Sequence, residues 1–196
     1  MSINIKSEIR VIGFDDCPFV FGQKETIVIG AVYRGGQYLD GLVSTKIKVD
    51  GMDSTEKIAE AVISSKHHKQ LQLIMLNGIT FGGFNVVDIK QLSKKTGLPV
   101  IAVVRHRPDL ISIKKAIKKL GDFKKRLNLI KNAGNIKKTL VSNNSTKRTV
   151  YFQLAGIEEE NAEKLIKLTA TRSIEPEPLR AAHIICTGMK PITYEK

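Results

Sequence analysis

The sequence has few cysteines, no long apolar run and a shortage of acidic residues. Cys17 and Cys186 are its two cysteines, and neither belongs to a Cys-x-x-Cys or Cys/His spacing, so a disulfide framework and a zinc site are not expected. Isolated cysteines are more often small buried residues than catalytic thiols, and a nucleophilic thiol stays open as the alternative. No stretch reaches the roughly 18 apolar residues of a membrane span, and the polar start is unlike a secretory signal. We therefore expect a cytoplasmic protein.

Basic residues outnumber acidic ones, with 32 Lys and Arg against 19 Asp and Glu and a formal net charge of +13. Residues 114–138 hold ten basic residues and one acid, so ten minus one places +9 of the +13 in this segment. A run of charged residues usually forms a solvent-exposed face, so a protein-interaction scaffold with a basic face is one interpretation of this segment. A face of one sign this dense favours a phosphate backbone, so we expect DNA or RNA as the partner. The expected contacts are Lys114, Lys115, Lys118, Lys124, Lys125 and Arg126.

The hydrophobic pattern predicts three strands, then helices alternating with strands. Period-two and continuously apolar runs predict strands, whereas apolar positions spaced by three and four after capping residues predict helices. The predicted strands are 8–16, 26–33, 38–49, 71–76, 98–104 and 149–154. The predicted helices are 53–68, 84–95, a basic pair broken near 121, 157–171 and 179–188. Residues 141–148 are read as a polar loop.

This order of elements predicts an α/β protein with a ribonuclease H-like mixed sheet, in which three antiparallel strands are followed by parallel strands and flanking helices. We expect one domain over residues 1–196, with a basic helical elaboration at about 109–140. The expected strand order is third, second, first, fourth, fifth. It places Asp15 and Asp16 beside Asn77 at the strand ends, where such sheets hold their ligands.

Paired carboxylates at this edge predict a site for Mg²⁺ or Mn²⁺, because hard cations prefer oxygen ligands and can clamp a phosphodiester. Successive strand residues point to opposite faces, so only one of Asp15 and Asp16 is expected to face the metal unless the strand has already ended. A double Asp that merely ends a strand is the alternative. After Asn77, the loop containing Gly78, Thr80, Gly82 and Gly83 could cradle a phosphate or a flipped base, or could be a structural turn.

Three segments resemble the endonuclease dU family, a mostly archaeal group related to endonuclease V. They are Ile12–Phe19, Val49–Thr55 and Asn77–Asp88. The likeness continues through Arg105–Asp109 and Leu179–His183, so it covers nearly the whole chain. It implies a divalent-metal-dependent endonuclease that nicks DNA beside a deaminated base, deoxyuridine for this family and deoxyinosine for endonuclease V.

The resemblance also implies site residues. Asp15 or Asp16 matches the metal ligand of the first strand, and position 77 matches an aspartate that ends the fourth. The acid supplied between them has no clear match, and Asp53 is preferred over Glu56 or Asp50.

Asn77 departs from the family pattern, because an amide offers a metal one neutral oxygen and no second charge. A catalytically weakened or inactive nucleic-acid-binding homologue is therefore the alternative function. The Asn77-Gly78 dipeptide is also prone to deamidation, which would restore an aspartate.

Four further residues complete the candidate site. His183, on the last predicted helix, could act as an acid or base or orient a phosphate, although a histidine among apolar neighbours is equally often a core residue. Arg105, Arg107 and Arg180 are expected to contact phosphates, because their guanidinium groups are permanently charged forks.

Overall fold

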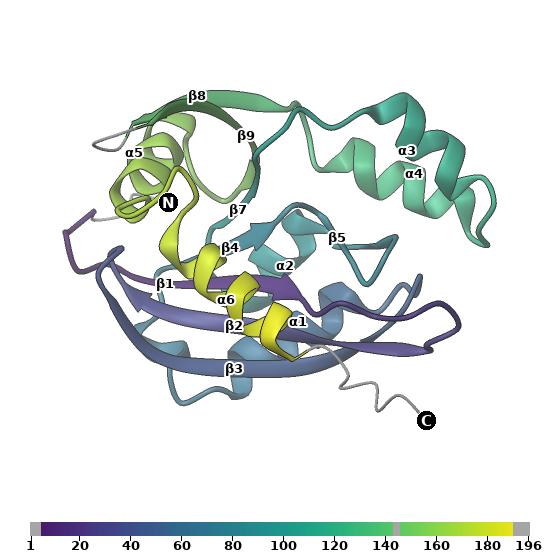
Figure 1. The fold of residues 1–196 in the computed structure, drawn as a ribbon, viewed down its shortest axis with the longest axis horizontal. Coiled ribbons are helices and arrows are strands. Elements are labelled where there is room, and N and C mark those ends of the chain that lie inside the picture. Colours follow the sequence, from purple (N-terminus) through teal and green to yellow (C-terminus); the bar gives the residue numbers. More distant parts are fainter. Residues whose placement is uncertain (1–4, 143–145, 190–196) are drawn as a thin grey trace.

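A computed structural model describes residues 5–142 and 146–189, and its ribbon shows a mixed sheet with helices on both faces (Figure 1). A seven-stranded sheet has the order β3-β2-β1-β4-β7-β9-β8. Its strands are β1 (Arg10–Asp16), β2 (Glu25–Arg34), β3 (Tyr38–Lys48), β4 (Leu73–Asn77), β7 (Val100–Val104), β8 (Lys137–Ser142) and β9 (Lys147–Ala155). A small hairpin follows β4 and consists of β5 (Thr80–Phe81) and β6 (Asn85–Val86).

The first five strands of this order confirm the predicted ribonuclease H-like sheet. β2 is antiparallel to β1 and β3, whereas β4 is parallel to β1 and β7. The helices are α1 (Ser54–Ser64), the 3-10 turn η1 (His68–Gln70), α2 (Ile89–Thr96), α3 (Leu110–Ile117), α4 (Phe123–Asn132), α5 (Glu159–Thr169) and α6 (Glu177–Gly188).

Among the described residues, two of the three apolar clusters lie on opposite faces of the sheet and hold the layers together. Phe14 of β1 packs in one cluster with Ile58 of α1. Val11 of β1 packs in the other with Leu165 of α5 and Leu179 of α6. Because successive strand residues point to opposite faces, each β1 side chain belongs to one of these two layers. This alternation decides where the two acids at the end of β1 point.

The predicted end of the basic elaboration at about residue 140 is wrong, because α4 ends at Asn132 and Lys137–Ser142 form β8. Thr139 and Val141 are buried while Leu140 is exposed, which is the period-two pattern of a strand. β8 pairs with β9, which starts at Lys147. The predicted loop over 141–148 is therefore wrong at both ends, and residues 143–145 within it lie outside the described residues.

The predicted start of the second helix at residue 84 is also wrong. Residues 85–86 form β6, the second strand of the hairpin, and α2 begins at Ile89. The Asp88 carboxylate accepts hydrogen bonds from the backbone N–H groups of Lys90 and Gln91, both at 3.0 Å. Asp88 is thus the N-cap that sets the start of the helix.

α3 and α4 join β7 to β8 and form the predicted basic helical pair, at the upper right of Figure 1. Within the described ranges, no helix is long and apolar enough to span a bilayer.

Candidate active site

Three polar side chains meet at the carboxyl ends of β1 and β4. Asp15 and Asn77 are neighbours because β1 and β4 are parallel, with Phe14 paired to Leu76 in the preceding register position. The Asn77 Nδ2 group donates to Asp15 Oδ1 at 3.0 Å. His183 Nδ1 lies 2.8 Å from Asp15 Oδ2, so both carboxylate oxygens are occupied. The structure thus brings together an acid, an amide and an imidazole from three separate elements.

Gly13 allows α6 to place His183 over Asp15. A Cβ atom at position 13 would lie 2.5 Å from the backbone carbon of Pro178, a separation that real Cβ atoms do not adopt. The helix therefore approaches β1 closely where the strand has no side chain, two residues before Asp15. His183 then lies about one and a half turns along α6 from this contact.

Burial dominates the electrostatics of Asp15, which is 5% exposed. It raises the pKa of this carboxyl above the ordinary 3.8, against the lowering effect of the hydrogen bonds from His183 and Asn77. The His183 side chain is 54% exposed, so the alternative of a core histidine is wrong. Because Nδ1 donates to a carboxylate, the solvent-facing Nε2 is the nitrogen that can exchange a proton with a ligand.

Asp16 points to the opposite face, as the strand alternation predicts. Its Oδ2 accepts a hydrogen bond from the backbone N–H of Gly82 at 3.0 Å, which fastens the β5–β6 hairpin to β1. Burial raises the pKa of Asp16 to about 6, and the nearby Asp15 charge adds to the rise. The Asp16 carboxylate therefore binds the hairpin, while it stays close enough to Asp15 and His183 for their charges to act on its pKa.

The glycines of the loop after Asn77 serve the backbone. Gly78, Gly82 and Gly83 all have positive φ angles. A Cβ atom on Gly83 would lie 2.4 Å from Asp50 Oδ1, which accepts a hydrogen bond from Phe84 N at 2.8 Å. The structural-turn interpretation therefore accounts for Gly83.

Asp53, the preferred middle acid, is not brought to the cluster. Its Oδ1 accepts hydrogen bonds from Lys48 N at 3.2 Å and Asn85 Nδ2 at 2.6 Å. Glu56 pairs with Lys95 Nζ at 2.8 Å. Of the three acids considered, Asp50 is the one in contact with the loop after Asn77, which we call the site loop (residues 78–84). Its backbone N–H donates to Gly82 O at 2.8 Å.

The donor set decides which metal the cluster could hold. Among residues 5–142 and 146–189, no group of three or more His, Cys, Asp or Glu side chains is placed to bind a metal ion. Asp15 and Asn77 nevertheless offer a carboxylate and an amide oxygen from adjacent strand ends, which fits one hard cation such as Mg²⁺ or Mn²⁺. A second cation would require another carboxylate on this face, and Asn77 provides none.

A cavity of about 880 Å³ lies beside the cluster, between the strand ends and the helices α3 and α4. Gly78, Thr80, Arg107 and Lys114 line it, so four of the predicted nucleic-acid contacts converge there. The apolar faces of α3 and α4 also line the cavity. Its volume falls within the range of about 300–1,000 Å³ that ligand pockets span.

The remaining predicted phosphate contacts divide into exposed and occupied groups. Lys115, Lys118 and Lys124 are exposed on α3 and α4 and in the turn between them. Lys125 is also exposed, with Nζ 3.2 Å from Asp122. These lysines remain available to a polyanion.

Two arginines are bound to acids. Arg105 forms an ion pair with Glu175 and keeps 54% of its side chain exposed. Arg180 pairs with Glu177 at 2.6 Å and is 30% exposed.

Arg126 is buried and does not serve as a phosphate contact in this structure, where it is 4% exposed. Its guanidinium donates to the carbonyl oxygens of Asp50 at 2.5 Å, Gly51 at 2.9 Å, Gly121 at 3.0 Å and Phe84. Arg126 therefore ties α4 to the loop after β3. Its regular place among lysines gave no sign of this role.

The sulfur atoms of Cys17 and Cys186 lie 2.9 Å apart, and the Cys186 thiol is 3.5 Å from the backbone carbonyl oxygen of Asp15. Both are buried, and burial raises the pKa of each thiol. Protonated, buried thiols fit the interpretation as small core residues better than that of a nucleophile.

The fold and this cluster define a ribonuclease H-like protein with polar residues at the carboxyl ends of its first and fourth strands. Residues 7–190 match the family model Endonuclease dU, and the chain belongs to this family. The predicted resemblance is thereby confirmed.

The relatives and structural neighbours agree with this assignment. A UPF0215 protein of Methanothermobacter thermautotrophicus is 50% identical over 187 residues, which are 94% of this chain and 89% of the relative. A protein of unknown function from Archaeoglobus fulgidus is 35% identical with a TM-score of 0.80, covering 91% of this chain and 96% of that one. Endonuclease V of Ciona intestinalis, solved with a DNA containing an inosine followed by a ribo-adenosine, shares the fold at a TM-score of 0.62. It is 15% identical, over 91% of this chain and 84% of that one.

Proposed function

We propose that this protein is a divalent-metal-dependent endonuclease that nicks DNA at a deaminated base, deoxyuridine or deoxyinosine. The observation that carries the proposal is the contact of Asp15 with both Asn77 and His183 at the carboxyl edge of the sheet. Membership of the Endonuclease dU family supports the nuclease class. The whole chain, residues 1–196, would act as one domain.

Asp15 and Asn77 would hold Mg²⁺ or Mn²⁺ through their side-chain oxygens. When bound, the cation would polarise the phosphodiester and lower the pKa of a water molecule. Asp15 also orients the imidazole of His183 through Nδ1, which leaves Nε2 to give or take a proton at a phosphate or leaving oxygen. Asp15 would thus be shared between metal binding and the positioning of His183.

The cavity beside the cluster would hold the deaminated base or the adjoining backbone. Gly78 and Thr80 line it from the loop, and Arg107 and Lys114 bring positive charge. The exposed lysines of α3 and α4 would contact phosphates farther along the duplex, where each bound phosphate steepens the salt dependence of affinity. Uracil and hypoxanthine would have to leave the base stack to enter this cavity.

A catalytically weakened homologue is the second candidate, and Asn77 favours it. The Asn77 amide donates to the Asp15 carboxylate where a family aspartate would add a second negative charge. The amide satisfies the carboxylate without metal and lowers the charge available to a cation. In this case the protein would bind nucleic acid through the same cavity with little or no cleavage.

A nicking assay tests the proposal. End-labelled duplexes containing one deoxyuridine, one deoxyinosine or no lesion are incubated with Mn²⁺, Mg²⁺ or EDTA. We expect a nick near the lesion only with metal, and a loss of about 100-fold or more in D15N, equivalent to about 2.7 kcal/mol in activation energy.

The matched control is D40N, because the Asp40 carboxylate binds Arg10 and Arg34 instead of the cluster. Lesion-independent cutting, or equal cutting by D15N and the parent, would contradict the proposed site.

A further inference from the structure

The loop between β1 and β2 displays an aromatic side chain to solvent. Phe21 has a relative exposure of 107%, and its neighbour Val20 is 56% exposed. A single exposed apolar residue is ordinary, but Phe21 is fully extended from the surface beside a second exposed apolar group. The loop therefore presents a ring that the fold does not use for packing.

The turn that carries Phe21 is held by hydrogen bonds. Gln23 N donates to Val20 O at 3.1 Å, and Val20 N donates to Gln23 Oε1 at 3.2 Å. The Gln23 side-chain amide also donates to Glu25 O at 2.5 Å. Gly22 has a φ of +85°, the conformation that a type II turn requires at its third residue. Phe21 is thus presented at a fixed corner of the chain.

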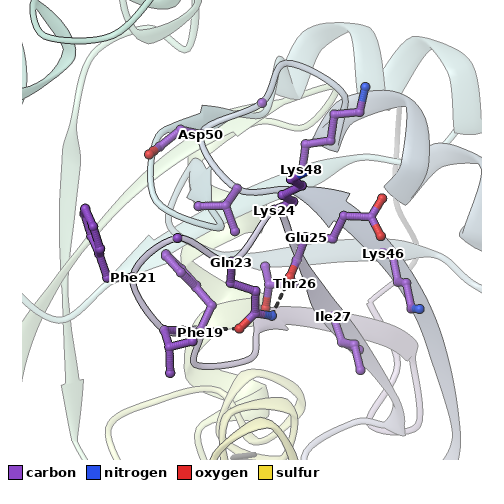
Figure 2. Close-up of a pocket in the computed structure, with 14 residues that line it drawn as sticks. Phe19, Phe21, Gln23, Lys24, Glu25, Thr26, Ile27, Lys46, Lys48 and Asp50 are labelled. Carbon is purple, nitrogen blue, oxygen red and sulfur yellow. Dashed lines mark hydrogen bonds between the residues drawn. The ribbon is translucent and has the colours of Figure 1, made fainter.

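A second cavity, of about 1050 Å³, opens between this loop and the end of β3. Lys24, Lys46 and Lys48 line it, together with two acids, Glu25 and Asp50. Figure 2 shows Phe21 and Asp50 on one side of the cavity and Lys46 on the other. The Asp50 carboxylate accepts a hydrogen bond from the backbone of the site loop, so the lysines are the freer charges.

The cavity adjoins the active-site edge through Thr26 and Gly82. Thr26 lines the cavity, and its Cγ2 would lie 3.1 Å from a Cβ atom on Gly82. Gly82 is the residue whose backbone N–H binds Asp16. The cavity therefore adjoins the hairpin that is hydrogen-bonded to Asp16, the residue that follows Asp15 of the cluster.

We propose that this cavity binds unpaired nucleotides of the cleaved DNA, with one base stacked on Phe21 and the adjoining phosphates bound by Lys24, Lys46 and Lys48. The inference rests on the proposed function for its ligand. It adds a second contact on the far side of Asp16, separate from the cavity beside Gly78. An aromatic ring among basic side chains is the combination with which proteins hold single strands without reading their sequence.

The charge around Phe21 favours nucleic acid over a protein partner. Three lysines against two acids leave an excess of positive charge along the lining of the cavity, and the whole chain carries +13. Base stacking also uses one exposed ring, whereas a protein interface needs a larger apolar patch. The proposed ligand is therefore single-stranded DNA, and a protein contact is the competing outcome.

A tryptophan reporter tests the proposal, because the chain contains no Trp. F21W keeps a stacking ring and provides one fluorophore at the turn. Y38W is the matched control: Tyr38 is 57% exposed at the opposite end of β3. Titration with an oligothymidylate of about 12 nucleotides in EDTA should quench F21W strongly and Y38W little. Equal quenching of both reporters, or none in F21W, would overturn the proposal.

Affinity and salt dependence give a second readout. F21A should weaken binding of the same oligonucleotide roughly 5- to 150-fold, the range of one lost base stack, whereas Y38A should not. K46A and K48A should each lower the salt slope by about 0.7, the value for one phosphate on a single strand. Unchanged affinity and slope in these variants would overturn the proposal and leave the loop as a protein contact.

The outcomes separate this inference from the nuclease proposal. If lesion DNA is nicked but F21W is not quenched, the stacking site is wrong and the nuclease stands. If F21W is quenched and no variant nicks DNA, the single-strand site stands and the nuclease does not.

Discussion

Asn77→Asp gives the sharpest perturbation of the cluster. The Asn77 amide nitrogen lies 3.0 Å from Asp15 Oδ1. An aspartate at position 77 would therefore place a carboxylate oxygen about where this nitrogen now lies. Without metal, one hydrogen bond is replaced by repulsion between two acids. With metal, the same pair becomes a charged chelate for a divalent cation.

The expected size of the effect follows from this distance. Two unit charges about 3 Å apart repel by about 5 kcal/mol at an effective dielectric constant of about 20 and by about 1 kcal/mol in bulk water. At roughly 2–4 °C per kcal/mol, N77D should melt about 2–20 °C below the parent in EDTA. Mn²⁺ at about 100 times its Kd should return about 2.7 kcal/mol, or roughly 5–11 °C.

Thermal unfolding with and without Mn²⁺, followed by the nicking assay, measures both effects. N77D should gain more stability from Mn²⁺ than the parent and should cut lesion DNA faster. D15N/N77D is the matched control, because it keeps one acid and one amide in exchanged positions and should lack the gain. Intact-mass analysis of the parent must show Asn at position 77, since deamidation would create the same variant.

The reasoning would be refuted if N77D were as stable as the parent in EDTA and no more responsive to Mn²⁺. That result would mean that the two side chains are not adjacent or that no cation binds between them. A response to Mn²⁺ in D15N/N77D equal to that in N77D would also refute it.

Three further predictions follow from the packing around the site. G13A should force Pro178 and the rest of α6 away from β1, which should lower the free energy of unfolding by about 1–3 kcal/mol and slow nicking. Thermal melting and initial rates measure the two effects. An unperturbed melting temperature would contradict the close approach. In EDTA, the pKa of Asp16 is 3.8 in the unfolded state and about 6 in the folded state, so the folded state binds more protons between these values. The stability that this difference contributes is lost as pH rises through the window. D16N should therefore gain stability relative to the parent from pH 4.5 to 7.5, and a constant difference in melting temperature would exclude this. R126M should lower the free energy of unfolding, measured in urea, by about 2–5 kcal/mol, because buried carbonyl groups lose their hydrogen-bond donor. A variant that is as stable as the parent and only binds DNA less tightly would show that Arg126 is a surface contact instead.

The neighbourhood of Asp15 and Asn77 could be predicted because it depends on strand order alone. Apolar strands separated by helices imply parallel pairing, and parallel pairing brings carboxyl ends together. The role of His183 could not be decided in this way. Its place over Asp15 depends on how closely α6 approaches Gly13, which is a tertiary contact between distant residues.

Charge misled the prediction in the basic segment. The run of lysines extends the predicted helical segment over Lys137 and Lys138, although the buried Thr139 and Val141 alternate with exposed residues as in a strand. Arg126 was grouped with the same lysines because it has the same charge and spacing. Its burial depends on carbonyl groups at Asp50 and Gly51, which are distant in sequence.

The acid between the two strands could not be chosen from the sequence. Asp50, Asp53 and Glu56 lie within one short segment, and their hydrogen bonds depend on partners outside it. Asp53 is held by Asn85 of the hairpin, whereas the backbone of Asp50 contacts Gly82. The second strand of the hairpin, β6, falls within the stretch predicted as helix, and the first, β5, within the predicted glycine loop.

The most direct test of the central claim is a crystal structure with Mn²⁺, read from the anomalous signal of the metal. We expect one peak within about 2.0–2.6 Å of Asp15 and Asn77 side-chain oxygens, with the Asn77 amide turned to present its oxygen. Loss of this peak in D15N would confirm the assignment. A parent crystal at saturating Mn²⁺ with no peak at Asp15, or with its peak at Asp16 alone, would contradict the account.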